Sequence, residues 1–321
     1  MGAFIPMLKN VIIFIALAVP GFILVKTKVL KQEQSAVLSK VLMYVGMPFL
    51  ILSGTLSISF NGETVLNLLW AAIFTVVITF IFIFLSKYTA TKNNATDELA
   101  SKKIEGAERF CAIFSNNGFL GLPLAAAVFG MGEVFTFLVI VNIVNNTIMY
   151  TAGVYLISGD KKTINLKKIF LNPVLIAFVI GTILNLIGIN KVLPEIATYS
   201  DHFKNIVTPL SMTILGMKMG EIEFSKLFTS WKMYYVAFIK LIIVPVISVG
   251  ITIFLCKVCG LNANMIKTMF VAFSVPTAAL ATAFADSYDG DIENSTIYTL
   301  GNTILSIATI PLLYLVLCLI I

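Results

Sequence analysis

Long apolar stretches follow one another along almost the whole chain, separated by short polar segments. A stretch of about 20 apolar residues crosses a hydrocarbon core of roughly 30 Å as a helix, whereas membrane β-strands show short alternating segments. The pattern therefore predicts an all-α polytopic membrane protein. Its ten predicted spans lie near residues 5–25, 36–57, 64–86, 108–129, 134–157, 169–188, 204–219, 232–256, 265–285 and 294–320.

Composition supports this class, since 59% of the 321 residues are hydrophobic and only 12% are charged. A soluble protein carries about twice that charged fraction. The net charge of +6 comes from lysines spread over short loops, so the expected partner is the lipid bilayer rather than a nucleic acid. The first apolar stretch has no positive region before it and no small-residue cleavage site, so we interpret it as a span and not a signal peptide.

The basic residues fix an orientation for the ten spans. The topology places five of them on one side: Lys9, Lys191, Lys204, Lys257 and Lys267. It places sixteen on the other: Lys26, Lys28, Lys31, Lys40, Lys87, Lys92, Lys102, Lys103, Arg109, Lys161, Lys162, Lys167, Lys168, Lys218, Lys226 and Lys232. Cytoplasmic loops of membrane proteins carry an excess of Lys and Arg. We therefore predict a multi-pass protein of the cell membrane, with both termini extracellular and the loop between the fifth and sixth spans cytoplasmic.

The two halves of the chain, residues 1–158 and 159–321, echo each other. Four features recur in the same order at offsets of 153, 161, 153 and 156 residues: Pro20 with Pro173, Pro48 with Pro209, Pro123 with Pro276, and "NNTI" at 145–148 with "GNTI" at 301–304. Each half has an odd number of predicted spans, so the second copy enters the membrane inverted. Inverted repeats of this kind are typical of secondary transporters.

The fourth and ninth predicted spans each contain a proline among small residues, Pro123 after Gly118 and Gly121, and Pro276 in "VPTA". Proline removes a backbone donor and kinks or breaks a helix. Non-helical backbone at membrane depth is tolerated where it lines a cavity or lies inside the protein, and broken spans in matching positions of two repeats indicate a midplane binding site. Half-helix N-termini at such a site suit an anion.

Several of these motifs resemble the auxin efflux carrier family, which includes the plant PIN proteins and bacterial permeases associated with malate and malonate. They are "NNGFLGLP" at 116–123, "NP" at 172–173, "KLIIVP" at 240–245 and "VPTA" at 275–278. The resemblance covers essentially the full chain. It implies two inverted five-helix repeats, a scaffold domain from helices 1, 2, 6 and 7, and a transport domain from helices 3–5 and 8–10. It also implies that helices 4 and 9 cross where an organic anion binds, and related carriers suggest a homodimer through the scaffold.

Neutral polar residues near the breaks are the candidates for substrate binding, because amides and hydroxyls donate to a carboxylate without repelling it. The alternative is that these side chains hydrogen-bond across helices. The acidic residues fall in loops or at span ends, with Glu108 and Asp286 closest to the membrane, so a carboxylate proton relay is not expected. The candidates are Asn116, Asn117, Asn145, Asn146, Asn302, Ser274 and Thr277, with Ser115, Asn142 and Thr303 behind them.

Lys240 is the one basic residue placed well inside a predicted span. An ionisable residue within the membrane is a functional hypothesis by default, and here it would be a charge partner for the substrate. The alternatives are that its side chain snorkels to the cytoplasmic interface or pairs with a carbonyl.

The sequence thus predicts a carrier of small organic anions, such as malate, malonate or an auxin-like acid, working by alternating access at a midplane crossover. Sodium or a proton can supply the coupling, and no cofactor and no metal site is expected. No aspartate pair, Ser/His pair or HExxH motif lies in the spans, so the chain is not expected to be an enzyme. A sodium/proton or other cation antiporter on the same fold, or an uncoupled channel, stays as the alternative.

Overall fold

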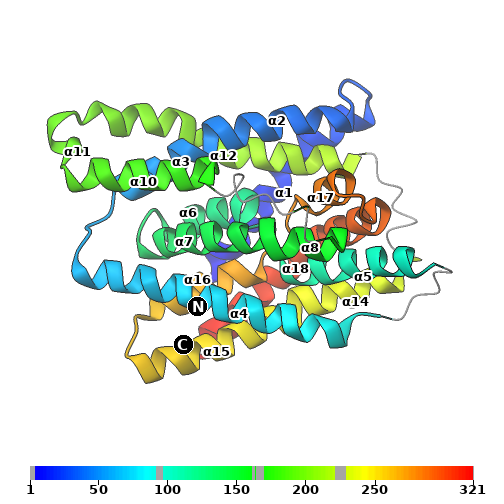
Figure 1. Cartoon of the computed structure of the whole chain (residues 1–321). Coiled ribbons are helices and arrows are strands. Elements are labelled where there is room, and N and C mark those ends of the chain that lie inside the picture. Colours follow the sequence, from blue (N-terminus) through cyan, green and yellow to red (C-terminus); the bar gives the residue numbers. More distant parts are fainter. Residues whose placement is uncertain (1–3, 92–96, 161–162, 164–169, 221–228, 321) are drawn as a thin grey trace. The chain divides into compact units, whose positions relative to one another are not determined.

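The computed structural model describes residues 4–91, 97–160, 163, 170–220 and 229–320. The described residues are almost entirely helical (Figure 1). The predicted loop between the fifth and sixth spans, with Lys161, Lys162, Lys167 and Lys168, lies largely outside the described residues, as do Lys92 and Lys226. The chain divides into two compact units, each built from residues of both halves of the sequence.

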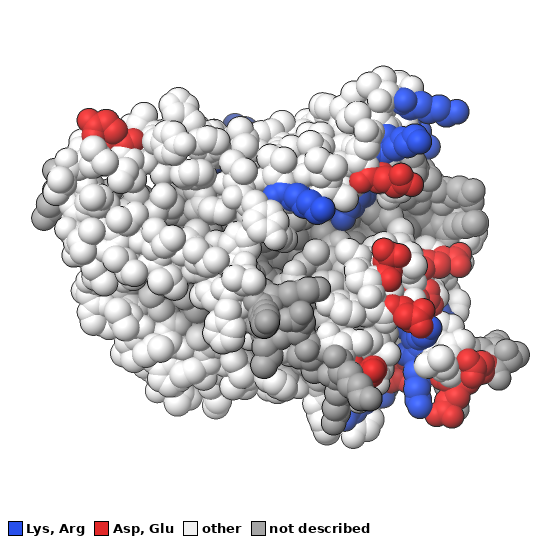
Figure 2. All heavy atoms as spheres, turned by 45° about the horizontal axis from the view of Figure 1, so that its top comes forward, with Lys and Arg blue, Asp and Glu red and all other residues white. Residues whose placement is uncertain are grey.

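Six helical stretches of the described chain are long and apolar enough to cross a membrane, which makes this a multi-pass membrane protein. They are Ile5–Lys26, Gln32–Leu56, Gly62–Thr89, Glu133–Ser158, Trp231–Cys259 and Ile292–Ile320, and each coincides with a predicted span. Most of the face drawn in Figure 2 is uncharged, as expected of helices surrounded by hydrocarbon.

The other four predicted spans do not correspond to single long apolar helices, since two are interrupted and two differ from the prediction in length. The span at 108–129 is divided between α5 (Glu98–Ile113) and α6 (Leu122–Phe129), and that at 265–285 between α16 (Ala263–Ser274) and α17 (Ala281–Ser287). The predicted span at 169–188 corresponds to α10 (Pro173–Leu186), whose 14 residues extend about 21 Å. The span predicted at 204–219 is too short, because α12 runs from Glu195 to Gly220. Its first turns contain charged residues such as Asp201 and Lys204, which lower the local hydropathy, so the predicted span began too late.

The first unit comprises Met1–Ala71, Gly118–Ile143 and Phe170–Ile222. It contains α1 (Phe4–Lys26), a second hydrophobic stretch made of η1 (Gln32–Gln34), α2 (Ser35–Val41), η2 (Leu42–Gly46) and α3 (Met47–Leu56), then α6, α10, α11 (Ile189–Val192) and α12. It also holds the first residues of α4 (Gly62–Thr89) and most of α7 (Glu133–Ile148).

Helices α1 and α12 of the first unit approach each other closely. A Cβ on Gly21 would collide with the carbonyl of Thr213, and one on Gly216 with the carbonyl of Ala18. Small residues let membrane helices approach so that van der Waals contacts hold them together. Next to this pair, α3 packs on α10 and α12 (Figure 1). The side chain of Asn185 donates to the carbonyls of Thr55, near the end of α3, and Ile58, just after it, both at 2.9 Å.

The second unit comprises Ala72–Asn117, Val144–Ile169 and Glu223–Ile321. It contains the rest of α4, α5, the end of α7 with η4 (Met149–Gly153) and α8 (Val154–Ser158), then α14 (Trp231–Phe238), η6 (Ile239–Ile243), α15 (Val244–Cys259), α16, α17 and α18 (Ile292–Ile320). Helix α18 packs on α5, α14, α16 and α17, so it is the common neighbour of the two broken spans.

Candidate crossover site

Both broken spans leave the helical conformation in the second unit. Helix α5 ends at Ile113, and Phe114 is extended at φ −81° and ψ 129°. Helix α16 ends at Ser274, and Val275 is extended at φ −67° and ψ 150°. A residue that precedes proline disfavours the helical region, so Val275 leaves the helix because Pro276 follows it.

The two extended segments pair with each other. Ser115 and Thr277 form an antiparallel bridge. The backbone N–H of Asn116 donates to the carbonyl of Pro276 at 2.8 Å, and that of Ala278 to the carbonyl of Phe114 at 2.9 Å. The breaks therefore satisfy part of each other's backbone hydrogen bonding, as buried non-helical backbone requires. In this pairing the two broken spans meet.

Gly118, Gly121 and Pro123 follow the pairing and belong to the first unit. Gly118 and Gly121 lie in the π-helical turn η3 (Asn117–Gly121), and Pro123 lies in the first turn of α6, where a missing N–H costs nothing. The break in this span is thus at residues 114–116, ahead of Pro123, whereas in the other span it is at Pro276 itself. A Cβ on Gly118 would lie 3.8 Å from Asn142 Oδ1, an ordinary contact, so crowding does not demand glycine there.

Lys240 reaches the pairing from η6. Its side chain is fully buried, and its Nζ donates to Ser115 Oγ at 2.5 Å and to the carbonyl of Ile113 at 3.3 Å. That carbonyl ends α5, where the helix dipole is negative. Of the alternatives that the sequence left open, snorkelling is wrong and pairing with a carbonyl is confirmed. Among the described residues no carboxylate lies within ion-pair distance of Nζ, so the ammonium has no full countercharge.

Asn302 and Thr277 extend this polar cluster. Asn302 Nδ2 donates to Thr277 Oγ1 at 2.6 Å, and Thr277 Oγ1 donates to the carbonyl of Cys111 at 2.6 Å. Both side chains are fully buried. The sequence could not identify the Cys111 carbonyl as a hydrogen-bond acceptor, because every residue has a backbone carbonyl whatever its side chain. Thr303 takes no part in these contacts, since its hydroxyl donates to Thr299 O at 2.7 Å in its own helix.

Four candidate residues present buried polar atoms without a partner in the structure. They are Asn117 Oδ1, Asn145 Nδ2, Asn302 Oδ1 and Ser274 Oγ. An unpaired buried polar atom costs about 1–3 kcal/mol, so such atoms call for a ligand or an ordered water. Asn116 and Asn146 are only partly buried. Lys240, Thr277 and Asn302 are joined through the paired segments, while Asn145 lies on α7 and is not part of that hydrogen-bonded chain.

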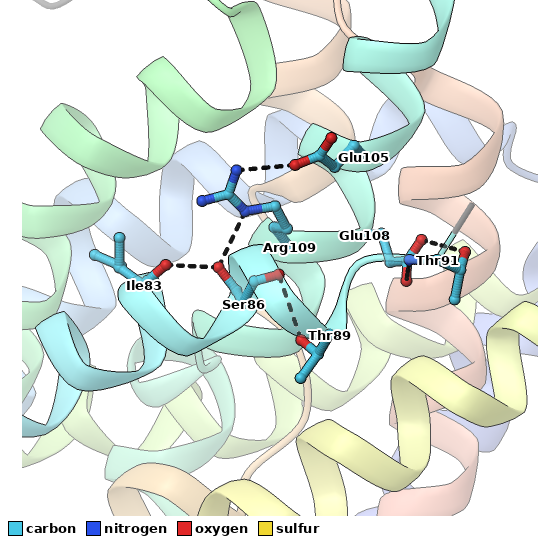
Figure 3. A network of polar contacts seen from close by, with 7 residues as sticks. All are labelled: Ile83, Ser86, Thr89, Thr91, Glu105, Glu108 and Arg109. Carbon is cyan, nitrogen blue, oxygen red and sulfur yellow. Dashed lines mark hydrogen bonds and ion pairs between the residues drawn. The ribbon is translucent and has the colours of Figure 1, made fainter. Parts of the chain in front are cut away.

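The buried acid of the second unit has a different environment. Glu108 on α5 accepts from the backbone N–H and the hydroxyl of Thr91, both at 2.8 Å (Figure 3). Beside it, Arg109 Nε donates to Ser86 Oγ at 3.0 Å and its Nη1 pairs with Glu105 at 3.1 Å. These contacts tie the chain after α4 to α5. Glu108 is the only buried acidic side chain among the described residues, and both of its oxygens are occupied.

The described part of the chain contains no group of three or more His, Cys, Asp or Glu side chains that could hold a metal ion. The cluster thus offers one buried lysine amine, together with amides and hydroxyls, where two helices break. Such a set can bind an anion by charge and hydrogen bonds.

Comparison with known proteins agrees with a membrane role. The family model that matches the chain, over residues 6–314, is described as "Membrane transport protein". A protein of Methanothermobacter thermautotrophicus described as an uncharacterized transporter is 29% identical over 307 residues. The match covers 95% of this chain and 96% of that protein.

Proposed function

Since the chain belongs to the membrane transport protein family, which includes the auxin efflux carriers, we propose that it is a secondary carrier of small organic anions. The substrates are carboxylates of the size of malate, malonate or an auxin-like acid. They bind at the cluster around the paired segments Phe114–Asn116 and Pro276–Ala278, and cross the membrane by alternating access.

The buried Lys240 carries this proposal. Burying an ammonium group away from water costs several kcal/mol unless an opposite charge accompanies it. Its partners are a hydroxyl and a carbonyl, each with only a partial charge. A carboxylate ligand supplies the missing negative charge, and its oxygens accept hydrogen bonds from the ammonium group. A cationic substrate would be repelled by the same group.

The unpaired polar atoms give the ligand further contacts. Asn145 Nδ2 and Ser274 Oγ are buried groups that can donate a hydrogen bond. Asn117 and Asn302 present oxygens, which suit a hydroxyl of the substrate or a coupling sodium ion. Lys240, Asn117, Asn145, Ser274, Thr277 and Asn302 all lie in one compact unit, so a domain that carries its ligand as a rigid body is consistent with their placement.

The alternative of a proton or cation antiporter needs a titratable acid at the site. Glu108 is about one and a half turns of α5 before Ile113, and both of its oxygens already accept from Thr91. We therefore favour an anion carrier, and we keep the predicted orientation with both termini outside and a homodimer through the scaffold as parts of the proposal.

A counterflow experiment tests the function. Purified protein in liposomes loaded with unlabelled malate, malonate, other dicarboxylates, short monocarboxylates or indole-3-acetate is diluted into the same labelled acid, with sodium or potassium outside. Saturable accumulation with one class of acid supports the carrier and names its substrate, and a sodium requirement names the driving ion. Flux that neither saturates nor exchanges would indicate a channel, and cation exchange independent of any carboxylate would indicate an antiporter.

A further inference from the structure

A groove of about 250 Å³ lies among α15, α16 and α18 of the second unit. Phe270 of α16 contributes to its wall, and all of its lining residues are apolar or glycine. Those on α18 repeat at the spacing of one helix face. The wall residues that matter below are Val246, Gly250 and Ile253 on α15 and Leu313, Val316 and Ile320 on α18.

The groove opens to the surroundings of the helices rather than into a closed core. Val246 on one wall is 54% exposed and Val316 on the other is 50% exposed. Helices α15 and α18 both belong to stretches that cross the membrane, so the solvent at their surface is lipid hydrocarbon. An unfilled groove would forfeit dispersion contacts along its walls, and an acyl chain restores them.

Two lysines stand at one end of this groove. Lys257 lies one turn beyond Ile253 on α15, and Lys267 lies about one turn before Phe270 on α16. Residues three or four apart share a helix face, so both lysines continue the faces that line the groove. The two helices are joined by a short turn at Gly260, where φ is +67°, so these ends lie together.

Neither lysine is neutralised within the described part of the chain. Lys257 is exposed, and Lys267 Nζ has only Asn264 Oδ1 as a partner, at 3.4 Å. Both also lie on the side of the membrane where the predicted topology places only five basic residues, so the positive-inside bias does not explain them. Basic pockets between membrane helices attract anionic lipid head groups.

We propose that the groove between α15 and α18 binds one acyl chain of an anionic phospholipid, whose head group lies at Lys257 and Lys267. The chain is held by shape and dispersion, which any lipid can satisfy, so the lysines supply the selectivity. Attraction of this kind contributes about fivefold in affinity per lysine. The proposal depends on the assignment of the spans and is independent of what the protein transports.

Native mass spectrometry of the full-length protein tests it, with palmitoyl-oleoyl phosphatidylglycerol and phosphatidylcholine added at graded concentrations. We expect phosphatidylglycerol to bind at least fivefold more tightly. K257Q/K267Q should abolish that difference while phosphatidylcholine binding stays unchanged. The matched control K9Q/K191Q removes the same charge from the same predicted side and should keep the difference.

Substitutions that fill the groove test whether the lipid binds there rather than elsewhere on the protein surface. Gly250 lines the groove and has open space where a Cβ would be, so Gly250→Leu places a larger side chain in the groove and should weaken both lipids at least fivefold. Val316→Phe does the same from the opposite wall, and Ile247→Phe, on an exposed position of α15 outside the groove, is the control. Equal binding of the two lipids to the wild type, or unchanged binding in both obstructed variants, overturns the proposal.

Discussion

Lys240 Nζ lies 2.5 Å from Ser115 Oγ, at the point where two extended segments that follow α5 and α16 pair with each other. This contact joins Lys240, on η6, to the chain that follows α5, 125 residues away in sequence. It places a lysine amine at the centre of the second unit, where no described carboxylate lies within ion-pair distance, and this is the basis for the first prediction.

Lys240→Met should lose carboxylate uptake by at least tenfold while the protein remains folded. Replacing a buried charge by an apolar side chain of similar length is often neutral or stabilising, because the desolvation cost disappears. Lys240→Arg, which keeps the charge, should retain more uptake than Lys240→Met. Uptake into liposomes and thermal unfolding are measured on the same preparations. Full uptake in Lys240→Met would exclude the lysine from the site.

Asn117→Ala and Asn302→Ala should separate binding from stability. Asn117 Oδ1 has no partner, so its loss should leave the free energy of unfolding nearly unchanged and abolish stabilisation by substrate. Asn302 donates to Thr277, so its loss should cost about 1 kcal/mol even without substrate.

The measurement is a thermal-shift titration with the carboxylate identified by counterflow. At a concentration about 100 times its dissociation constant, a ligand stabilises its protein by about 2.7 kcal/mol, which gives a clear shift. An unaltered shift in Asn117→Ala would show that this amide does not contact the substrate.

Glu108→Gln should keep transport and its pH dependence, because we assign this carboxylate to anchoring Thr91 rather than to carrying protons. Glutamine keeps one acceptor oxygen for Thr91, so the expected loss of stability is about 1 kcal/mol, and Glu108→Ala should lose about 1–3 kcal/mol. Uptake is compared at acidic and neutral pH. If the pH dependence of uptake disappeared in Glu108→Gln, the result would support the antiporter alternative.

Gly216→Leu should prevent stable folding of the first unit, because the Cβ of the new side chain would overlap the carbonyl of Ala18 on α1. Overpacking of a close helix contact costs about 1–3 kcal/mol or more. Gly62→Leu is the matched control, since a Cβ there meets nothing within 4 Å. Yield and thermal unfolding in detergent report the effect, and equal stability of the two variants would contradict the close contact.

Cys259 offers a test of orientation in the native chain. It is exposed at the end of α15, on the predicted external side, while Cys111 and Cys256 are buried. An impermeant maleimide should label Cys259 on intact cells. In Lys161→Cys carried on Cys259→Ser/Cys318→Ser, labelling should require permeabilisation. The opposite result at both positions would invert the predicted topology.

The local sequence determined where helices form and where one of them breaks. Six unbroken apolar stretches were predicted with nearly the observed bounds, because in hydrocarbon the chain has to satisfy its backbone within each helix. The break at Pro276 was predictable for the same kind of reason, since proline restricts the residue before it whatever surrounds it. The choice of Lys240, Thr277 and Asn302 as candidates likewise needed only the rule that polar groups at membrane depth are rare.

The tertiary structure decided which groups meet. The partner break occurs at Phe114–Asn116 rather than at Pro123, because pairing with the segment after Val275 fixes the position of that break. Lys240 is buried against Ser115 instead of reaching an interface, and no residue pattern on its own helix encodes that direction. Contacts between residues more than 100 positions apart depend on how helices pack, so the sequence supplied the candidates and the packing joined them.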